Sequence, residues 1–369
     1  MRMAVGSAVA LAALPVLVLA LGAGSASAQP ASGNPGPPKG FEAQSASFVS
    51  AQTGYALGAR QCSELPCKAL LEKTVNGGKT WTSVPAPAVS LEPPFTTQPT
   101  SAVSTVRFVN ASDGWLFNPG LWATTDGGAQ WHRVFLPGVV VALAASDGVG
   151  FASAEPANGG LGTARLYRSQ VGASAWAPVA DVTPADALTV SGHSIWAGVA
   201  PTMWTSTDSG KNWSKLSFRC PSNAPDATAV AAASPADVAL ACANQGYPQP
   251  GSSYKDVFTS ADGGHTFHLA GHPAEPGEPG LLAMPPAHPQ VITLTAVSGA
   301  SYLYRSINGG QTWQRTTYFD GGLGFRDLAY VSATTGYLIH FGGSPAIAYT
   351  KGLMKTQKAG ATWQSVPIP

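Results

Sequence analysis

Apolar positions in this chain come in short runs that are separated by polar, glycine-rich turns. One unit of eight residues shows the pattern best: Thr74-Val75-Asn76-Gly77-Gly78-Lys79-Thr80-Trp81 starts with a hydroxyl, turns through Asn-Gly-Gly and ends with an aromatic ring. It recurs at 124–131, 206–213, 260–267, 306–313 and 356–363, and a degenerate copy lies at 169–176. Asp or Asn followed by Gly between apolar runs is typical of a tight β-turn. The pattern therefore predicts seven related hairpins, each closed by an aromatic residue.

A second recurring element gives the phase of the repeat. Residues 48–55, 108–115 and 330–337 each contain a short apolar run, a polar turn that ends in Gly, and a second apolar run. A third strand then leads into the eight-residue unit, and a fourth leaves from its aromatic residue. Successive terminal aromatics lie 50, 45, 37, 54, 46 and 50 residues apart, which fits four strands per repeat. We expect an all-β fold, a seven-bladed β-propeller of four-stranded antiparallel blades with these turn hairpins, over residues 41–369.

The polar residue at the third position of the unit has a structural interpretation. A carboxylate or amide oxygen there accepts hydrogen bonds from the amides of its own turn, and the terminal aromatic packs between neighbouring sheets. Seven copies cannot each be an active site, so we interpret these residues as scaffold and not as catalytic groups. The residues concerned are Asn76, Asp126, Asp208, Asp262 and Asn308.

Composition excludes several classes of protein. Twenty Lys and Arg against nineteen Asp and Glu leave a net charge of +1, and charged residues make up only 11% of the chain. Soluble domains usually have about 25%. A nucleic-acid binder that works through a strong basic field is therefore excluded. The 42 Gly and 31 Pro predict frequent turns and few long helices.

The first 28 residues have the features of a signal peptide. Arg2 supplies a positive charge, residues 9–21 form an apolar stretch, and Ala26-Ser27-Ala28 offers a cleavage site. The alternative is an uncleaved N-terminal membrane anchor, because the apolar stretch approaches spanning length. Residues 29–40 are rich in Pro and Gly and are expected to form a disordered lead-in, and no later segment is apolar enough to span a membrane. We therefore expect a secreted or otherwise extracytoplasmic protein.

The four cysteines fit that oxidising compartment. Cys62 and Cys67 are close enough in sequence to bridge a hairpin loop, and Cys220 and Cys242 then pair by elimination. A metal site built from all four thiolates usually needs two close pairs, which the second spacing does not provide. His265, His268 and His272 are close in sequence, but strand geometry sends the first two to opposite faces. No metal and no cofactor is expected.

The repeated unit resembles the Asp-box, or BNR repeat. Together with the Phe-Val…Gly-Trp/Tyr element, the chain resembles the photosystem II stability/assembly-factor-like seven-bladed propellers, and more distantly the propellers of sialidases, sortilins and xyloglucan hydrolases. The resemblance to the first group implies a propeller without cofactor that binds protein partners. An arginine-rich face of that group is not matched, because the ten Arg of this chain are scattered singly.

The main alternative is a glycoside hydrolase that acts at the mouth of the propeller. Resemblance to sialidases would imply an Arg-Ile-Pro element, an arginine triad and a Tyr/Glu pair, and the sequence has no Arg-Ile-Pro. Glycosidase chemistry otherwise needs only two carboxylates at a suitable separation. The discriminating feature is therefore the lining of the central channel: converging carboxylates indicate an enzyme, whereas small and apolar residues indicate a binder.

Partner binding is expected on the face that carries the variable connections. In a propeller the loops between second and third strands and the links between blades share one face, and here they vary in length while the repeated turns are uniform. Variable loops on a rigid scaffold usually determine specificity. Our hypothesis is a monomeric, non-enzymatic propeller that binds a protein or glycan partner on this face. The candidate binding residues are Arg60, Tyr247, Tyr254, Asp320 and Arg326.

Overall fold

The computed structural model describes residues 40–60, 66–92, 100–156, 164–179, 182–183, 187–199, 202–244, 252–320, 322–342 and 352–369. Two units are distinguished along the chain, Met1–Gly36 and Pro37–Pro369. The predictions for the signal peptide and for residues 29–39 of the lead-in lie outside the described residues. All the architecture below belongs to the second unit.

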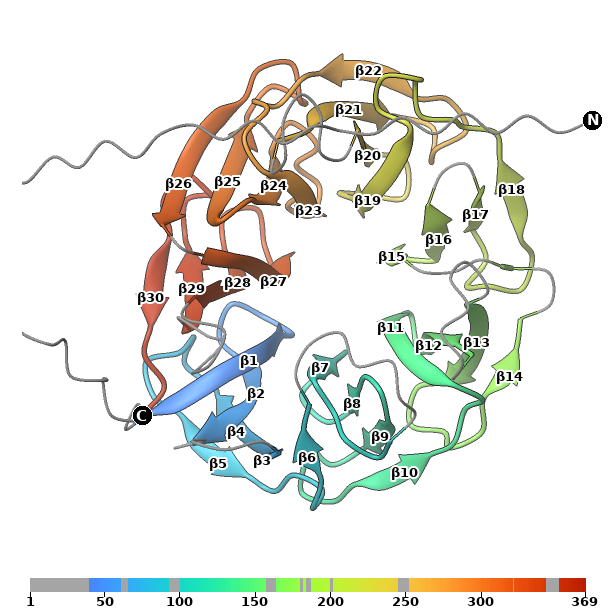
Figure 1. The fold of residues 1–369 in the computed structure, drawn as a ribbon. Helices are drawn as coiled ribbons and strands as arrows, with labels where there is room; N and C mark the ends of the chain where they lie inside the picture. Colours follow the sequence, from blue (N-terminus) through green and yellow to red (C-terminus); the bar gives the residue numbers. More distant parts are fainter. Residues whose placement is uncertain are drawn as a thin grey trace, which may run out of the picture. The chain divides into compact units, whose positions relative to one another are not determined.

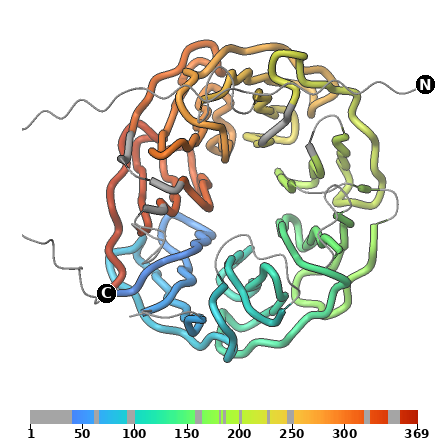
Figure 2. The backbone as a smooth tube through the Cα atoms, in the orientation of Figure 1, coloured from blue at the N-terminus to red at the C-terminus, as the bar shows by residue number. Residues whose placement is uncertain are grey.

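Seven four-stranded antiparallel sheets form a ring, as the sequence predicted (Figure 1). The described residues contain strands and turns but no helix. The tube view shows the same ring, with the chain running around it once from blue to red (Figure 2). In each blade the first strand lies next to the central channel and the fourth lies at the rim.

Strand bounds follow the repeat. Blade 1 contains β1 (Phe41–Phe48), β2 (Gly54–Arg60), β4 (Leu70–Thr74) and β5 (Thr82–Val84). Blade 2 contains β7 (Thr105–Phe108), β8 (Gly114–Phe117), β9 (Leu121–Thr124) and β10 (His132–Val134). Blade 3 contains β11 (Val139–Ser146), β12 (Val149–Glu155), β13 (Arg165–Gln170) and β14 (Ala177–Pro178). Blade 4 contains β15 (Leu188–Ser191), β16 (Ser194–Val199), β17 (Thr202–Ser206) and β18 (Ser214–Leu216).

The remaining blades have longer strands. Blade 5 contains β19 (Asp226–Ala232), β20 (Val238–Asn244), β21 (Tyr254–Ser260) and β22 (His268–Gly271). Blade 6 contains β23 (Glu278–Ala283), β24 (Ile292–Val297), β25 (Ala300–Ser306) and β26 (Gln314–Asp320). Blade 7 contains β27 (Gly322–Tyr330), β28 (Gly336–Gly342), β29 (Gly352–Thr356) and β30 (Gln364–Val366). A separate pair, β3 (Cys67–Lys68) with β6 (Ser90–Leu91), joins the first loop of blade 1 to the link that follows that blade.

The repeated turn is closed by the hydrogen bonds that its residue types suggest. In blade 2, Asp126 Oδ1 accepts from the Thr124 hydroxyl at 2.8 Å and from the Gln130 amide at 2.9 Å. The Thr124 oxygen in turn accepts from the Gly128 amide at 3.0 Å. Gly128 has a φ of 93°, which L side chains rarely adopt, so glycine is required there. Asn76, Asp208, Asp262 and Asn308 accept equivalent bonds in their own blades.

Aromatic rings fill the seams between blades. Phe108 of blade 2 stacks on Tyr55 of blade 1 with 3.5 Å between ring centroids, and Trp131 packs edge-on against Phe108. The same contact recurs where the ring closes, because Phe48 of blade 1 stacks on Tyr337 of blade 7 at 3.4 Å. These rings belong to the apolar clusters between the blades. Blades 7 and 1 therefore meet through the same kind of aromatic stacking that joins blades 1 and 2.

Ring closure, which the sequence left undecided, involves no shared strand. The Tyr337 hydroxyl donates to Ala51 O at 3.1 Å, just as the Tyr55 hydroxyl donates to Ala111 O at 2.8 Å in the next seam. Lys355 Nζ adds a bond to Gly77 O at 3.0 Å. Side chains of blade 7 thus hold the turns of blade 1, and all four strands of both blades come from one continuous stretch each.

The structure contains the Cys220–Cys242 disulfide, which ties the link between blades 4 and 5 to β20. Cys67 is also disulfide-bonded. Its predicted partner, Cys62, lies outside the described residues. Within the described part of the chain, no helix has the length and apolar character needed to cross a membrane.

Candidate functional site: the central channel

Seven inner strands converge on the axis of the ring, and two of them are especially rich in small and apolar residues. β19 has four alanines and a valine among its seven residues, and β11 has three valines, three alanines and a leucine among its eight. These strands leave a cavity of about 500 Å³ within the channel, lined by residues of β7, β11, β15, β19, β23 and β27. That volume is within the range of small-molecule and cofactor sites.

Apolar side chains line most of this cavity without being fully buried. Leu188, Val190, Leu281 and Leu328 are all only partly covered by other residues. Binding pockets in proteins are usually lined by apolar side chains with a few polar groups among them. The chemistry of the lining therefore favours an apolar or small-residue ligand.

The cavity lies toward one end of the channel. Its lining residues come from the last part of most inner strands, such as Leu143 to Ala145 in β11 and Leu328 to Tyr330 in β27. Each inner strand ends at the short turn to its second strand, and this turn is on the same face as the repeated hairpin turns. The cavity is therefore closer to the uniform turns than to the variable connections.

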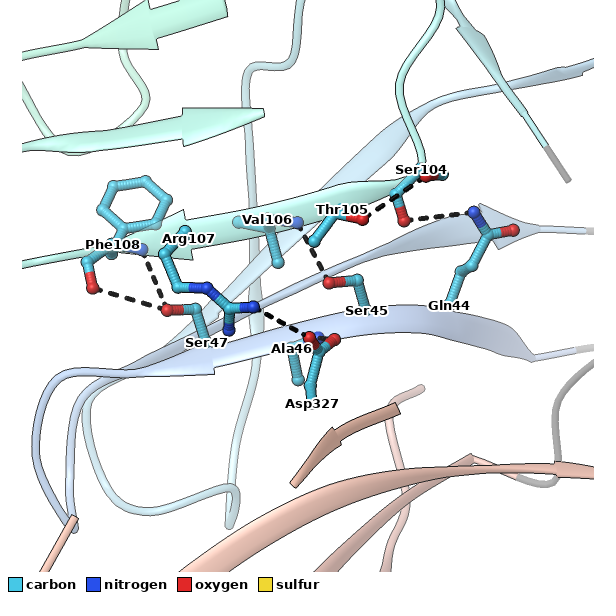
Figure 3. Close-up of polar contacts among 10 residues, drawn as sticks. All are labelled: Gln44, Ser45, Ala46, Ser47, Ser104, Thr105, Val106, Arg107, Phe108 and Asp327. Carbon is cyan, nitrogen blue, oxygen red and sulfur yellow. Dashed lines mark hydrogen bonds and ion pairs between the residues drawn. The ribbon is translucent and has the colours of Figure 1, made fainter. Parts of the chain in front are cut away.

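The charged side chains of the described cavity lining are those of Arg107 and Asp327, and they form an ion pair. Arg107 Nη2 of blade 2 lies 3.2 Å from Asp327 Oδ1 of blade 7, and the two side chains are 31% and 7% exposed (Figure 3). The second carboxylate oxygen of Asp327 accepts from the Ala46 amide at 2.9 Å. Asp327 has a φ of 52° and lies where the register of β27 shifts, which aims its side chain across the channel. One carboxylate thus connects blades 7, 1 and 2.

Serine side chains of β1 accept hydrogen bonds from backbone amides on the inner edge of β7, the first strand of blade 2. Ser45 Oγ accepts from the Val106 amide at 3.0 Å, and Ser47 Oγ accepts from the Phe108 amide at 2.9 Å (Figure 3). Gln44 Nε2 donates to Ser104 O at 3.2 Å and to Glu92 O at 2.7 Å. Buried backbone groups need such partners. The junction of blades 1 and 2 is therefore a rigid wall of the channel.

Four of the predicted binding residues lie in described strands, in blades 1, 5, 6 and 7. Arg60 lies in the closing seam, where it pairs with the buried Glu72 at 2.9 Å, donates to Pro369 O and covers the ring of Phe41. Tyr254 begins β21 and is half-buried. Arg326 lies in β27 beside Asp327, and burial lowers the pKa of its guanidinium. Tyr247 and the side chain of Asp320 lie outside the described residues. The structure gives no contact between Arg60, Tyr254 and Arg326.

Arg107 and Asp327 were missed from the sequence. They are 220 positions apart, and only the ring closure and the irregular backbone at Asp327 bring them together. The one sequence signal was that Asp327 directly follows Arg326, a residue already singled out.

Lys255 was missed as well. Its ammonium, 1% exposed as a residue, donates to the carbonyl oxygens of Ser253, Glu275 and Gly277 at 2.7 to 3.0 Å. Burial lowers its pKa to about 8. Lys255 therefore fixes the loop before β21 and the link between blades 5 and 6, both on the variable face.

The chemistry available in the described residues is limited. Asp327 is the one carboxylate that lines the channel cavity, and no group of three His, Cys, Asp or Glu is placed to hold a metal within the described chain. Asp147, His193 and Ser209 meet among the short turns of blades 3 and 4, but Asp147 and Ser209 both contact the same ring nitrogen, Nδ1 of His193. A catalytic relay needs the two nitrogens of the imidazole to act separately, so this arrangement is not a triad.

Comparisons with known proteins support the fold. The sequence matches no protein-family model, and none of the curated proteins is similar to it. Among solved structures, YCF48 bound to D1 peptide is 17% identical with a TM-score of 0.54, over 87% of this chain and 95% of that one. YCF48 from Cyanidioschyzon merolae is 15% identical with a TM-score of 0.57, over 87% and 96%. The GH74 xyloglucanase from Xanthomonas campestris is 13% identical with a TM-score of 0.57, over 89% of this chain but 55% of that one. At these identities the likeness shows the propeller fold alone.

Proposed function

We propose that this protein is a non-enzymatic, extracytoplasmic binding propeller, of the assembly-factor kind, that receives an extended segment of a protein partner in its central channel. The observation that carries the proposal is the cavity of about 500 Å³ with its small and apolar lining. Its one described carboxylate, Asp327, already forms two structural contacts. A preformed, rigid and largely apolar channel suits binding of a segment with small side chains.

The choice of a protein partner rests on a structural neighbour. A propeller with the same fold, YCF48, has been solved with a bound D1 peptide. The Cys220–Cys242 disulfide supports an oxidising location, in agreement with the signal peptide expected from the sequence. The variable face, with Lys255 fixing two of its connections, is the second surface that the partner would contact.

A channel-filling variant tests the proposal. Ala144→Trp adds an indole to the cavity lining, and Ala129→Trp, at an exposed position of the repeated turn of blade 2, is the matched control. The full chain is used to capture partners from the envelope of the producing organism, and captured proteins are quantified by mass spectrometry. We expect a partner that is retained by the parent and by Ala129→Trp and lost with Ala144→Trp. A partner retained equally by all three would contradict channel binding.

A second candidate function is glycoside hydrolysis, because GH74 xyloglucanases share the fold. This chain covers 55% and 47% of the length of the two GH74 chains, so it spans about half of such an enzyme. Incubation with xyloglucan and with aryl-glycosides, including sialosides, tests this candidate. Release of product that is lost in Asp327→Asn would establish the enzyme and refute the binding proposal.

A further inference from the structure

The rim between blades 3 and 4 has a second surface that the channel proposal does not use. A groove of about 630 Å³ runs there, lined by Arg168 and residues 177–179 of blade 3 and by Trp204 and residues 210–213 of blade 4. It lies beside the degenerate copy of the repeat. The outer strand of blade 3, β14, has two residues, whereas β5, β10, β18 and β30 have three.

Two indole rings form the apolar part of the groove. Trp204 and Trp213 are both partly exposed. Their ring nitrogens are already used, since Trp204 Nε1 donates to Thr183 O at 3.3 Å and Trp213 Nε1 donates to Gly210 O at 3.2 Å. The hydrogen-bonded edges hold the rings in place, so their exposed surface is preorganised for contact with the C–H face of a sugar ring.

Cationic and amide groups surround these rings. Arg168 Nε donates to Ser209 O at 3.0 Å, and its two terminal nitrogens have no partner among the described residues. The exposed ammonium of Lys211 likewise has none in that part of the chain, and Lys215 lies over the Trp204 ring. The side-chain amide nitrogen of Asn212 donates to Asp208. That bond fixes the orientation of the Asn212 amide, and its carbonyl oxygen is able to accept a hydrogen bond from a sugar hydroxyl. The described lining contains no carboxylate.

We propose that this groove binds an anionic oligosaccharide, with sugar rings packed on Trp204 and Trp213 and a uronic-acid carboxylate paired with Arg168 and Lys211. Guanidinium and carboxylate groups form strong charge-assisted hydrogen bonds. An acidic peptide is less suited to the groove, because a peptide on a sheet edge binds through main-chain hydrogen bonds. Here that edge is two residues long, and one of them, Pro178, has no amide hydrogen.

The repeat supplies matched controls for the test. Lys79 occupies in the blade 1 turn the position that Lys211 occupies in blade 4, and Trp122 occupies in β9 the position that Trp204 occupies in β17. Neither control lines the groove. The full chain is titrated by calorimetry with hexagalacturonate, with an uncharged galactose hexamer and with hexaglutamate.

We expect hexagalacturonate to bind with a Kd below 1 mM, and both the galactose hexamer and hexaglutamate to bind at least tenfold more weakly. Arg168→Gln with Lys211→Gln should weaken hexagalacturonate at least tenfold, whereas Lys79→Gln should not. Trp204→Phe should weaken it severalfold and Trp122→Phe should leave it unchanged. The proposal is overturned if hexagalacturonate does not bind, if hexaglutamate binds equally well, or if the paired controls weaken binding as much as the groove variants.

Discussion

Single side chains stabilise the turns and blade junctions of this protein because their oxygens accept hydrogen bonds from backbone amides. The carboxylates of Asp126, Asp208 and Asp262 close exposed turns, and that of Asp327 connects three blades. Asn76 and Asn308 close the same turn without a charge, so the geometry depends on the oxygen and not on ionisation. The turn residues were predictable because their bonds are local. Asp327 was not, because its partners are distant in sequence.

The turn carboxylates predict how acid affects stability. Hydrogen bonds from the Asn212 amide, then from the Asn212 side chain, lower the pKa of Asp208 from 3.8 to about 2. The pKa of Asp126 is lowered chiefly by the Gln130 amide, and that of Asp262 chiefly by the Thr266 hydroxyl. A carboxyl whose pKa is lower in the folded state contributes stability above its unfolded pKa and loses it as the pH falls through the folded pKa. Stability should therefore decline between about pH 4 and pH 2.

Replacement of all three by Asn should reduce this decline, since Asn76 and Asn308 show that Asn closes the turn. Urea unfolding of parent and triple variant at several pH values between 2 and 7 measures the difference. Other carboxylates still titrate, so the slope should become smaller but not vanish. An unchanged slope in the triple variant would contradict the assignment.

Asp327 should be more costly to lose than any turn carboxylate. Asp327→Ala leaves the Ala46 amide without its acceptor and Arg107 without its partner, which should lower the free energy of unfolding by roughly 2 to 3 kcal/mol. The free energy of unfolding is also measured for Arg107→Met, alone and combined with Asp327→Ala. The comparison separates the contribution of the Arg107–Asp327 ion pair from that of the hydrogen bond to the Ala46 amide. A loss below about 0.5 kcal/mol, the range of ordinary surface substitutions, would show that the junction is not structural.

At the scale of elements, the hairpins could be predicted from the sequence more completely than the seams between blades. The hairpins follow from Gly and Asp or Asn at fixed positions, and Gly128 shows the φ of 93° that requires glycine. The seam contacts of Phe48, Tyr55 and Tyr337 lie in the second repeating element, so their recurrence was visible but their stacking was not. The position of Arg60 shows the limit. It was a candidate binding residue of the variable face, but its side chain pairs with Glu72 on the neighbouring strand of its own blade, and Pro369 reaches it only when the ring closes.

Arg60 should therefore affect stability. Arg60→Ala leaves Glu72, which is 2% exposed, without its cation, and should lower the free energy of unfolding by about 2 kcal/mol. Arg133→Ala, an exposed arginine of β10, is the control and should change it by less than about 0.5 kcal/mol. Chemical denaturation of both variants checks this. Unchanged stability with lost partner capture would instead support the original hypothesis of a binding residue.

At the scale of the whole molecule, the ring was predictable because its period is repeated seven times, whereas the channel was not. The cavity, its position near the uniform turns and the single ion pair of its described lining depend on how seven blades converge. The sequence hypothesis placed binding on the variable face. The cavity adds a second location, and the two can be separated because they lie toward opposite faces of the ring.

Site-specific photo-crosslinking tests the central claim of a channel-bound protein segment most directly. A photoreactive phenylalanine analogue is placed at Leu188 in the cavity, at Tyr254 at the start of β21, or at the exposed Val75 in the turn of blade 1, and the full-length protein is irradiated with the envelope proteins of its organism. We expect one discrete adduct from Leu188, absent from Val75 and abolished when Ala144→Trp is introduced. Adducts from Val75 or Tyr254 alone, or a Leu188 adduct that survives Ala144→Trp, would contradict binding in the channel.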